Sequence, residues 1–479
     1  MRALGTIALA GLTLCASAGA QVLPPNLRGG PKLPPDQLEA KKTAAIQKGV
    51  RWLLDNQAAD GSWSYPNEPV RHEHYPMTQG VTALSALALL KCGVDPKEPA
   101  ITRAFDFMEK AEMVYTYSVA CVLLACEARA TWTPPPPPGS SDKDGTRVRA
   151  DKKKAKPSPQ DLALARKALA FLLAHQAPKG LWRYPGPGGE EDLSNTQYVM
   201  LALGAADRLG LSVPREVYEK AAARLVEVQE QDGPDMEPFP FPGADLPFKE
   251  LKKIADEFEK ELRKLDKRFE GKPDEAKDER GLTKADHMQT MTRSVAQRVS
   301  EGTRTRKGNP TESRGLKARG WCYIPADQPR MHTMDATVTG SMTTSGLVGL
   351  LSCKAALEGS GRYERELEPQ ITRSLRDGAA WLVRNYAIER NPGHSLHHLY
   401  FLYGLERVGI LGLLDKFGTH DWYQEGAQLL IARQTPEGQW LAIQGTAGAV
   451  PDTCFALLFL AKGTTPVVAM PSRVKTGDY

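Results

Sequence analysis

Beyond its N-terminal end, the sequence has no apolar run that approaches the ~20 residues needed to cross a bilayer. We therefore expect no transmembrane helix. A net charge of +5 is small for 479 residues and gives no reason to expect a nucleic-acid partner. No CxxC pair and no Cys/His pair has the spacing of a structural zinc site, so the sequence predicts no metal and no other cofactor.

The N-terminal end is typical of a secretory signal peptide. Met1-Arg2 precedes the apolar run Ala3–Leu14, and Ala18-Gly19-Ala20 provides a cleavage site before Gln21. We expect residues 1–20 to be removed and the mature protein to be exported, either periplasmic or secreted. Export permits disulfides, but buried free thiols fit the pattern equally well. The six cysteines left after cleavage are Cys92, Cys121, Cys126, Cys322, Cys353 and Cys454.

One pattern occurs three times: an apolar helix that ends in Gln-x3-Gly-x-Trp. Each copy combines helical spacing of apolar residues with a glycine turn and a final aromatic residue. A fourth outer helix, Lys220–Gly233, lacks this ending, but Gly320-Trp321 follows a long insertion. The copies contain Gln57, Gly61 and Trp63; Gln176, Gly180 and Trp182; and Gln434, Gly438 and Trp440.

Each copy is followed by a more continuously apolar segment, which predicts pairs of outer and inner helices. The chain contains six such pairs. Units that bury their faces only against neighbours can avoid exposed ends by closing into a ring. The sequence therefore predicts an all-α (α/α)6 toroid with the inner helices around a central funnel.

The toroid should occupy residues 37–465, after a Pro-rich arm at residues 21–36 and before a tail at residues 466–479. Two insertions interrupt it. Residues 133–159 are rich in proline and lysine and are predicted to be a disordered loop. Residues 234–319 contain two charged amphipathic segments, which predict an inserted helical hairpin.

The full pattern, Lys/Arg-Gly/Ala-x2-aromatic-Leu-x3-Gln-x3-Gly-x-Trp, resembles the repeat of the squalene and terpene cyclases. These enzymes share an α/α toroid with the protein prenyltransferase β subunits. The similarity covers about residues 40–465 apart from the insertions, and the chain looks most like exported bacterial members of this superfamily. The first copy matches at Lys48, Gly49, Trp52, Leu53, Gln57, Gly61 and Trp63, and the second at Lys167, Ala168, Phe171, Leu172, Gln176, Gly180 and Trp182.

In that family the glutamine holds the turn and the tryptophan packs over it, so the resemblance implies structural roles for these residues. It implies a different role for the start of the last inner helix. Class II terpene cyclases carry Asp-x-Asp-Asp-Thr-Ala there, and the middle aspartate protonates the substrate. This chain retains Asp452 and Thr453, but Pro451 stands at the acid position and cannot donate a proton.

A second comparison concerns Asp452-Thr453-Cys454, which is similar to the Asp-x-Cys zinc ligands of prenyltransferase β subunits. His397 or His398 on the neighbouring repeat would complete such a site. The repeat order is reversed relative to that family, and an exported protein lacks an isoprenoid diphosphate supply. We therefore expect no metal here.

The starts of the inner helices supply the candidate site. Aligning their apolar runs places hydroxyl residues at one position in five of six repeats, which predicts N-caps around one mouth of the funnel. The converging helix N-termini would favour an anionic group. The candidate binding residues are Tyr117, Asn195, Gln197, Thr343, His397, His398, Tyr400, Asp452 and Cys454, of which Asp452 and His397 are the catalytic candidates.

These observations favour a non-catalytic binding module that holds a partner protein segment or an apolar ligand. The alternative is an enzyme acting on an isoprenoid-like lipid, with Asp452 and His397 at the mouth. The residues leave the ligand and the partner unidentified.

Overall fold

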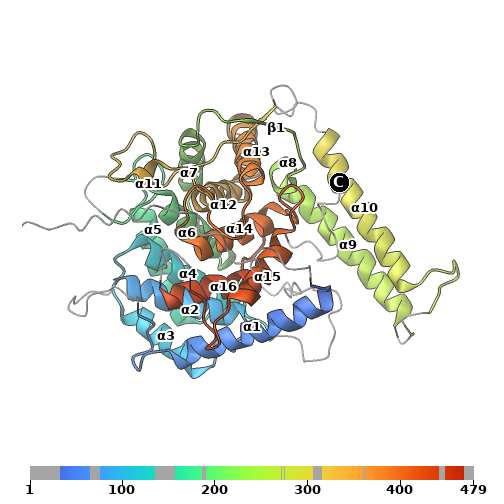
Figure 1. Cartoon of the computed structure of the whole chain (residues 1–479), viewed down its shortest axis with the longest axis horizontal. Coiled ribbons are helices and arrows are strands. Elements are labelled where there is room, and N and C mark those ends of the chain that lie inside the picture. Colours follow the sequence, from blue (N-terminus) through green and yellow to red (C-terminus); the bar gives the residue numbers. More distant parts are fainter. Residues whose placement is uncertain are drawn as a thin grey trace, which may run out of the picture.

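The structure is a computed structural model that describes residues 33–64, 76–134, 157–185, 190–270, 272–273, 276–305, 315–359, 361, 363–441 and 448–468. Within these residues the fold is all-α apart from one two-stranded sheet (Figure 1). The outer helices are α1 (Pro35–Asp55), α3 (Pro99–Lys110), α5 (Pro159–Ala174), α7 (Arg215–Glu227), α13 (Glu368–Arg384) and α15 (Trp422–Arg433). The inner helices are α2 (Pro76–Lys91), α4 (Thr116–Ala130), α6 (Leu193–Arg208), α12 (Gly340–Leu357), α14 (His398–Gly412) and α16 (Ala449–Leu460).

The inner helices form a closed ring. Contacts run from α2 to α4, α6, α12, α14 and α16 in turn, and α16 contacts α2 again. Outer helix α1 likewise contacts α15 across the same junction, so the first and last helix pairs meet. The predicted (α/α)6 toroid with an inserted helical hairpin is confirmed.

Burial explains why the two rings differ in sequence. Helices α4, α12 and α16 are buried along nearly their whole length, because each packs between two inner neighbours and an outer helix. A helix buried on every side must be apolar on every side. Outer helix α3 buries only the stripe of Ile101, Ala104, Phe105 and Met108, and its other face is polar.

Where the repeated motif occurs, it joins one outer helix to the next. The Gln57 amide donates to the carbonyls of Gly61, in its own turn, and of Ala100, in α3. Gln176 makes the equivalent bonds to Gly180 and to Val217 in α7. The last copy closes the circle, because Gln434 donates to Gly438 and to Ala45 in α1, each at 2.8 Å.

The motif tryptophans lie fully inside. The indole of Trp63 donates to the Leu53 carbonyl at 2.8 Å, and Trp182 and Trp440 bond in the same way to the residue ten positions earlier. Burial of one tryptophan removes roughly 150–250 Å² from water. The structural role that the resemblance implies agrees with this geometry.

The long insertion lies inside the fourth copy of the motif and leaves its hydrogen bonds intact. Gln229 donates to the carbonyls of Arg319 and Ser374, and the Trp321 indole donates to the Leu225 carbonyl. The two ends of the insertion pair as antiparallel strands, β1 (Asp235–Met236) with β2 (Leu316–Lys317).

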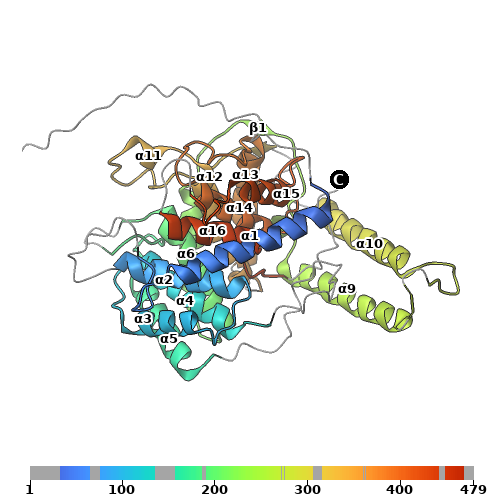
Figure 2. The same ribbon diagram turned by 60° about the horizontal axis from the view of Figure 1, so that its bottom comes forward.

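The insertion contains a projecting helical hairpin made of α9 (Phe248–Phe269) and α10 (Lys284–Thr305). Both views show it extending away from the ring (Figures 1 and 2). A short helix, α8 (Pro242–Asp245), forms its base and contacts α10, α13 and α14. The remaining short helix, α11 (Thr333–Ala336), lies between β2 and α12.

Several predictions concern residues that the structure leaves undescribed. The signal peptide at residues 1–20, most of the arm and most of the tail lie outside the described residues, as do 135–156 of the predicted loop. Within the described residues, no helix is both long enough and apolar enough to cross a membrane. The six cysteines found there are free thiols.

Candidate functional site

The six inner helices run parallel, so the ring has an N-terminal end and a C-terminal end. At the N-terminal end, inner-helix hydroxyls accept hydrogen bonds from the backbone N–H of the motif tryptophans. Thr82 accepts from Trp63 at 3.0 Å, Thr196 from Trp182 at 3.0 Å and Thr453 from Trp440 at 3.1 Å. These bonds fix the turn after each outer helix to the inner helix that follows.

This arrangement corrects the prediction that the hydroxyls cap the inner helices. The N-caps of α6, α12 and α16 are Asp192, Thr339 and Gly448, which lie several residues earlier in the chain. The fourth repeat is also shifted by one position, since Thr343 rather than Thr344 faces the N–H of Trp321, at 3.4 Å.

The predicted residues of the last two repeats lie around the first turns of α14 and α16. His397 is exposed and has a left-handed backbone with φ of 60°. His398 is buried, with one ring nitrogen 2.8 Å from the Ile388 carbonyl and the other 3.3 Å from the Arg433 guanidinium. Burial lowers the pKa of His398 to about 4, so its ring is neutral at physiological pH.

Asp452 and Cys454 are both buried in α16. The Cys454 sulfur lies 3.5 Å from the Ser85 hydroxyl, and burial raises the pKa of the thiol to about 12. A thiol with that pKa is protonated at neutral pH and is a poor nucleophile. Among the described residues, no group of three His, Cys, Asp or Glu side chains is placed to hold a metal ion.

The remaining candidates lie on α4, α6, α12 and α14. Gln197 donates to the Tyr400 hydroxyl at 2.5 Å. The same hydroxyl lies 2.9 Å from that of Ser194. Asn195 donates to its N-cap residue Asp192. Tyr117 is half-buried on α4, and Thr343 is buried on α12.

Tyr117 and Tyr400 belong to a cluster that fills the middle of the ring, which we call the aromatic plug. It consists of Tyr117, Tyr198, Tyr400, Phe455 and Tyr403, and consecutive rings are 4.6, 6.2, 5.7 and 6.0 Å apart between centroids. These spacings are those of edge-to-face and offset aromatic pairs.

A cavity of about 240 Å³ opens at the C-terminal end of the ring. Its walls come mostly from the C-terminal halves of five inner helices and are largely apolar, with Leu87, Leu124, Met200, Leu201 and Leu411 among them. Tyr403 of the plug also lines it. None of the nine binding residues predicted from the sequence lines this cavity.

Charged side chains surround the opening of this cavity and neutralise one another. Burial raises the pKa of Glu127, but Lys91 at 3.7 Å and Arg208 at 2.8 Å outweigh burial and lower it overall. The Tyr218 hydroxyl donates to Asp207 at 2.8 Å. The opening is therefore polar at its rim while the walls behind it are apolar.

The chain after α16 covers part of the opening. Residues Gly463–Val467 line the cavity. Thr464 donates from its backbone and its hydroxyl to the buried carboxylate of Glu406, and Lys91 donates to the Thr465 hydroxyl at 2.9 Å.

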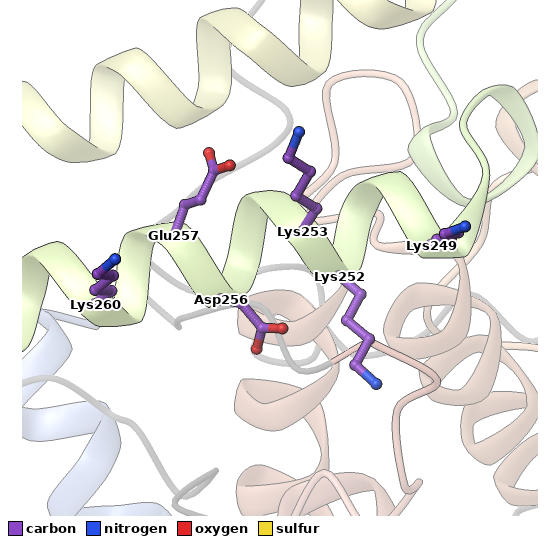
Figure 3. Close-up of a pocket in the computed structure, with 6 residues that line it drawn as sticks. All are labelled: Lys249, Lys252, Lys253, Asp256, Glu257 and Lys260. Carbon is purple, nitrogen blue, oxygen red and sulfur yellow. The ribbon is translucent and has the colours of Figure 1, made fainter.

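A second hollow lies on the exposed surface of α9 and has a different character. Its lining is Lys249, Lys252, Lys253, Asp256, Glu257 and Lys260, all from one helix. Figure 3 shows Lys253 and Glu257 pointing to one side of α9 and Lys252 and Asp256 to the other. Six residues from one helix cannot enclose a ligand, so we interpret this hollow as a solvated surface.

Sequence reasoning missed the buried charged residues of the ring, among them Asp192 and Arg407. Asp192 accepts from the Asn195 backbone at 2.7 Å, and burial raises its pKa to about 6. Arg407 lies fully inside between two tyrosine rings. The Asp192-x2-Asn195 spacing is an N-cap signal that could have located the first; for Arg407 the only signal is a charge within an apolar run.

No protein-family model matches the chain, and no curated protein matches it by sequence. Solved structures of the type II terpene cyclase MstE from Scytonema are similar to it. The complex with geranylgeranyl dihydroxybenzoate, described as substrate, is 10% identical with a TM-score of 0.45, and the apo structure is 10% identical with a TM-score of 0.44. Each covers 90% of this chain and 99% of its own. At these values the likeness concerns the terpenoid cyclase-like toroid alone and says nothing about activity.

Proposed function

We propose that this protein binds an apolar small molecule in the cavity at the C-terminal end of its ring and does no chemistry on it. The observation that carries the proposal is the cavity itself, with apolar walls on five parallel inner helices. Ligand sites are typically concave, apolar and preformed, with a few polar groups that set orientation. The polar rim at Glu127 and Arg208 fits that description.

The first test is to look for the ligand that the protein carries. An organic extract of the purified protein, analysed by mass spectrometry, should contain a hydrophobic molecule in near-stoichiometric amount. A cavity-filling variant provides the second arm. A Cβ at Gly204, which lines the cavity, would meet only the Arg208 side chain at 3.4 Å, so Gly204→Leu should fill the space without disturbing the backbone.

The matched control is Gly361→Leu, because Gly361 is exposed and a Cβ there also meets only an arginine side chain, that of Arg365. We expect the Gly204 variant to lose the extracted molecule and the Gly361 variant to keep it. Equal amounts of ligand in both variants would show that the cavity is not the binding site.

The alternative is an enzyme acting on an isoprenoid-like lipid. One observation favours it: Asp192 is a buried carboxyl group at the N-terminal end of the ring with a pKa raised to about 6 by burial. It is held by Asn195 and lies 3.9 Å from Arg183. Conversion of an added prenyl lipid that is abolished by Asp192→Asn or Asp452→Ala, with the fold preserved, would favour the enzyme over the binding module.

A further inference from the structure

Among the residues that the structure describes, Arg407 is a buried cation whose guanidinium makes no hydrogen bond of ordinary geometry. Its side chain is completely excluded from solvent, and none of its three guanidinium nitrogens has a partner among the described residues. Its guanidinium carbon lies 3.7 Å from the centre of the Tyr403 ring and 4.6 Å from that of Tyr198. Such contacts attract a cation to the ring face but satisfy no N–H donor.

Three other buried cations in the described chain do have hydrogen-bond acceptors. Arg224 is paired with Glu191, Glu227 and Asp327. Arg376 donates to Asp245 at 2.6 Å. The Lys354 ammonium donates to three backbone carbonyls. Because a buried charge without an acceptor is strongly unfavourable, the contrast points to an acceptor for Arg407 beyond the described residues.

The neighbouring residues compensate this charge incompletely. Burial raises the pKa of Glu406, next to Arg407 in sequence, to about 7, although the charge of Arg407 favours the ionised form. Its two oxygens accept from the hydroxyl and backbone of Thr464. Burial raises the pKa values of the Tyr198 and Tyr403 phenols, so these groups are neutral at any physiological pH. Among the described residues, no carboxylate therefore forms a hydrogen bond with the Arg407 guanidinium.

Helical geometry places this charge at the inner end of the cavity. Residues four apart lie on one face of a helix, so Tyr403, Arg407 and Leu411 share a face of α14. Tyr403 and Leu411 both line the cavity, and Arg407 lies between them in the helix. The Tyr403 ring lines the cavity and also lies against the guanidinium, so a small movement of that ring would give a ligand access to it.

We propose that the apolar ligand of the cavity has an oxyanion at one end, a carboxylate or a phosphate monoester, which binds the Arg407 guanidinium. A guanidinium forms paired, charge-assisted hydrogen bonds with either group. The apolar body of the ligand then extends toward the opening between α2, α4 and α6. This inference rests on the proposed function, to which it adds the chemical class of the ligand.

The test compares three ten-carbon probes with delipidated protein by isothermal titration calorimetry: decanol, decanoate and decyl phosphate. Each is titrated into wild type, Arg407→Met and Arg208→Met. Methionine fills the space of Arg407 without its charge. Arg208→Met tests the competing position for the acid, because Arg208 is a second cation that lines the same cavity but lies near its rim. Thermal melting checks that each variant is folded, and Arg407→Gln replaces the methionine variant if that one is not.

We expect wild type to bind decanoate or decyl phosphate at least about tenfold more tightly than decanol, as for a charge-assisted hydrogen bond. Arg407→Met should reduce the binding of the acid to that of decanol and leave decanol binding unchanged. Which of the two acids binds more tightly distinguishes a carboxylate ligand from a phosphate ligand.

Three outcomes would overturn the inference. If wild type binds decanol as tightly as both acids, the ligand is uncharged and only the proposed function stands. If Arg208→Met, but not Arg407→Met, removes the preference, the acid lies at the rim. If none of the probes binds, the proposed function fails and the inference fails with it.

Discussion

At the residue scale, the clearest consequence of the structure concerns Glu406. This side chain is completely buried, and it accepts hydrogen bonds from the backbone and the hydroxyl of Thr464. Burial raises its pKa to about 7, whereas the ordinary value is 4.5. The folded protein therefore binds a proton at Glu406 more tightly than the unfolded chain does.

This difference predicts that stability falls as the pH rises. Below pH 4.5 the group is protonated in both states and its contribution is fully present; between pH 4.5 and 7 only the unfolded chain loses the proton, and above about pH 7 the contribution is lost. A shift of this size corresponds to about 3 kcal/mol. Glu406→Gln should remove the decline, which thermal melting between pH 4.5 and 8 will measure relative to wild type.

Glu127 is the control for Glu406, because its pKa is shifted in the opposite direction. It is equally buried, but Lys91 and Arg208 lower its pKa overall. Its contribution is present above the unfolded pKa and is lost as the pH falls. Glu127→Gln should therefore flatten the acid side of the stability curve, and identical curves for the two variants would refute the assignment of these shifts.

The sequence predicts the roles of residues in the repeated motif. It does not predict the roles of residues whose contacts come from distant parts of the chain. The structural roles of Gln57, Trp63 and their equivalents follow from repetition alone. The alignment of the inner helices predicts that the hydroxyl of Thr82 caps a helix, but it binds the N–H of Trp63, because the helix begins earlier than the apolar run indicates. The burial of Arg407 depends on residues of other helices, such as Tyr198 of α6, and has no local signature.

At the scale of elements, the motif glutamines connect neighbouring outer helices, and Gln434 closes the ring. Gln434→Ala would remove its bonds to Gly438 and to Ala45 of α1. Each bond contributes about 1 kcal/mol, so we expect a loss of roughly 2–3 kcal/mol in urea unfolding. Hydrogen exchange should increase most in α1 and α15.

The control for this variant is Gln231→Ala. Gln231 is exposed, and its two bonds, at 3.4 and 3.5 Å, stay near the end of one helix. It should change the free energy of unfolding by less than about 0.5 kcal/mol. Equal effects of the two variants would mean that the junction between α15 and α1 contributes nothing to stability.

The base of the hairpin depends on Lys354 of α12. Its ammonium donates to the carbonyls of Gly243, Ala244 and Leu246 at 2.7, 2.9 and 2.7 Å. Lys354→Met would leave buried carbonyls without donors, each at a cost of about 1–3 kcal/mol. We expect faster hydrogen exchange in α8 and the start of α9, and a lower melting temperature.

Lys252→Met is the matched control, since Lys252 is exposed on α9 and its loss changes the net charge by the same amount. It should leave exchange and melting unchanged. Protection of α8 that survives in Lys354→Met would show that the apolar contacts of Phe241 hold the base without the lysine.

Elements were easier to predict than the position of the site. The outer and inner helices differ in apolar pattern because they are buried on one side or on all sides, and that pattern is local. The split fourth motif is visible in the sequence as Gly320-Trp321. The sequence does not indicate at which end of the ring a cavity remains. That depends on how the rings of the aromatic plug pack between α4, α6, α14 and α16.

At the scale of the molecule, the ring and the hairpin are distinct parts with different roles in stability. Helices α9 and α10 pack chiefly on each other, and α10 also contacts α8. In contrast, α8 is part of the ring's core: Asp245 pairs with Arg376, and the Phe241 ring is closely packed against Gly412. The ring's packing therefore includes α8, although α8 lies within the insertion at residues 234–319.

Two deletions test the boundary between the ring and the hairpin. Removing residues 249–313 and joining the ends with a short Gly-Ser linker should leave cooperative unfolding and decanol binding close to wild type, because α8 and the cavity remain. Removing Pro234–Arg319 joins Gly233 to Gly320 and restores an uninterrupted Gln-x3-Gly-x-Trp sequence. It nevertheless deprives Lys354 of its three acceptors and Arg376 of Asp245, and a broken buried ion pair alone costs roughly 3–5 kcal/mol. We expect this longer deletion to be severely destabilised in thermal melting, so that a restored motif does not compensate for lost packing. A stable longer deletion, or a shorter one that fails to fold, would place the boundary elsewhere.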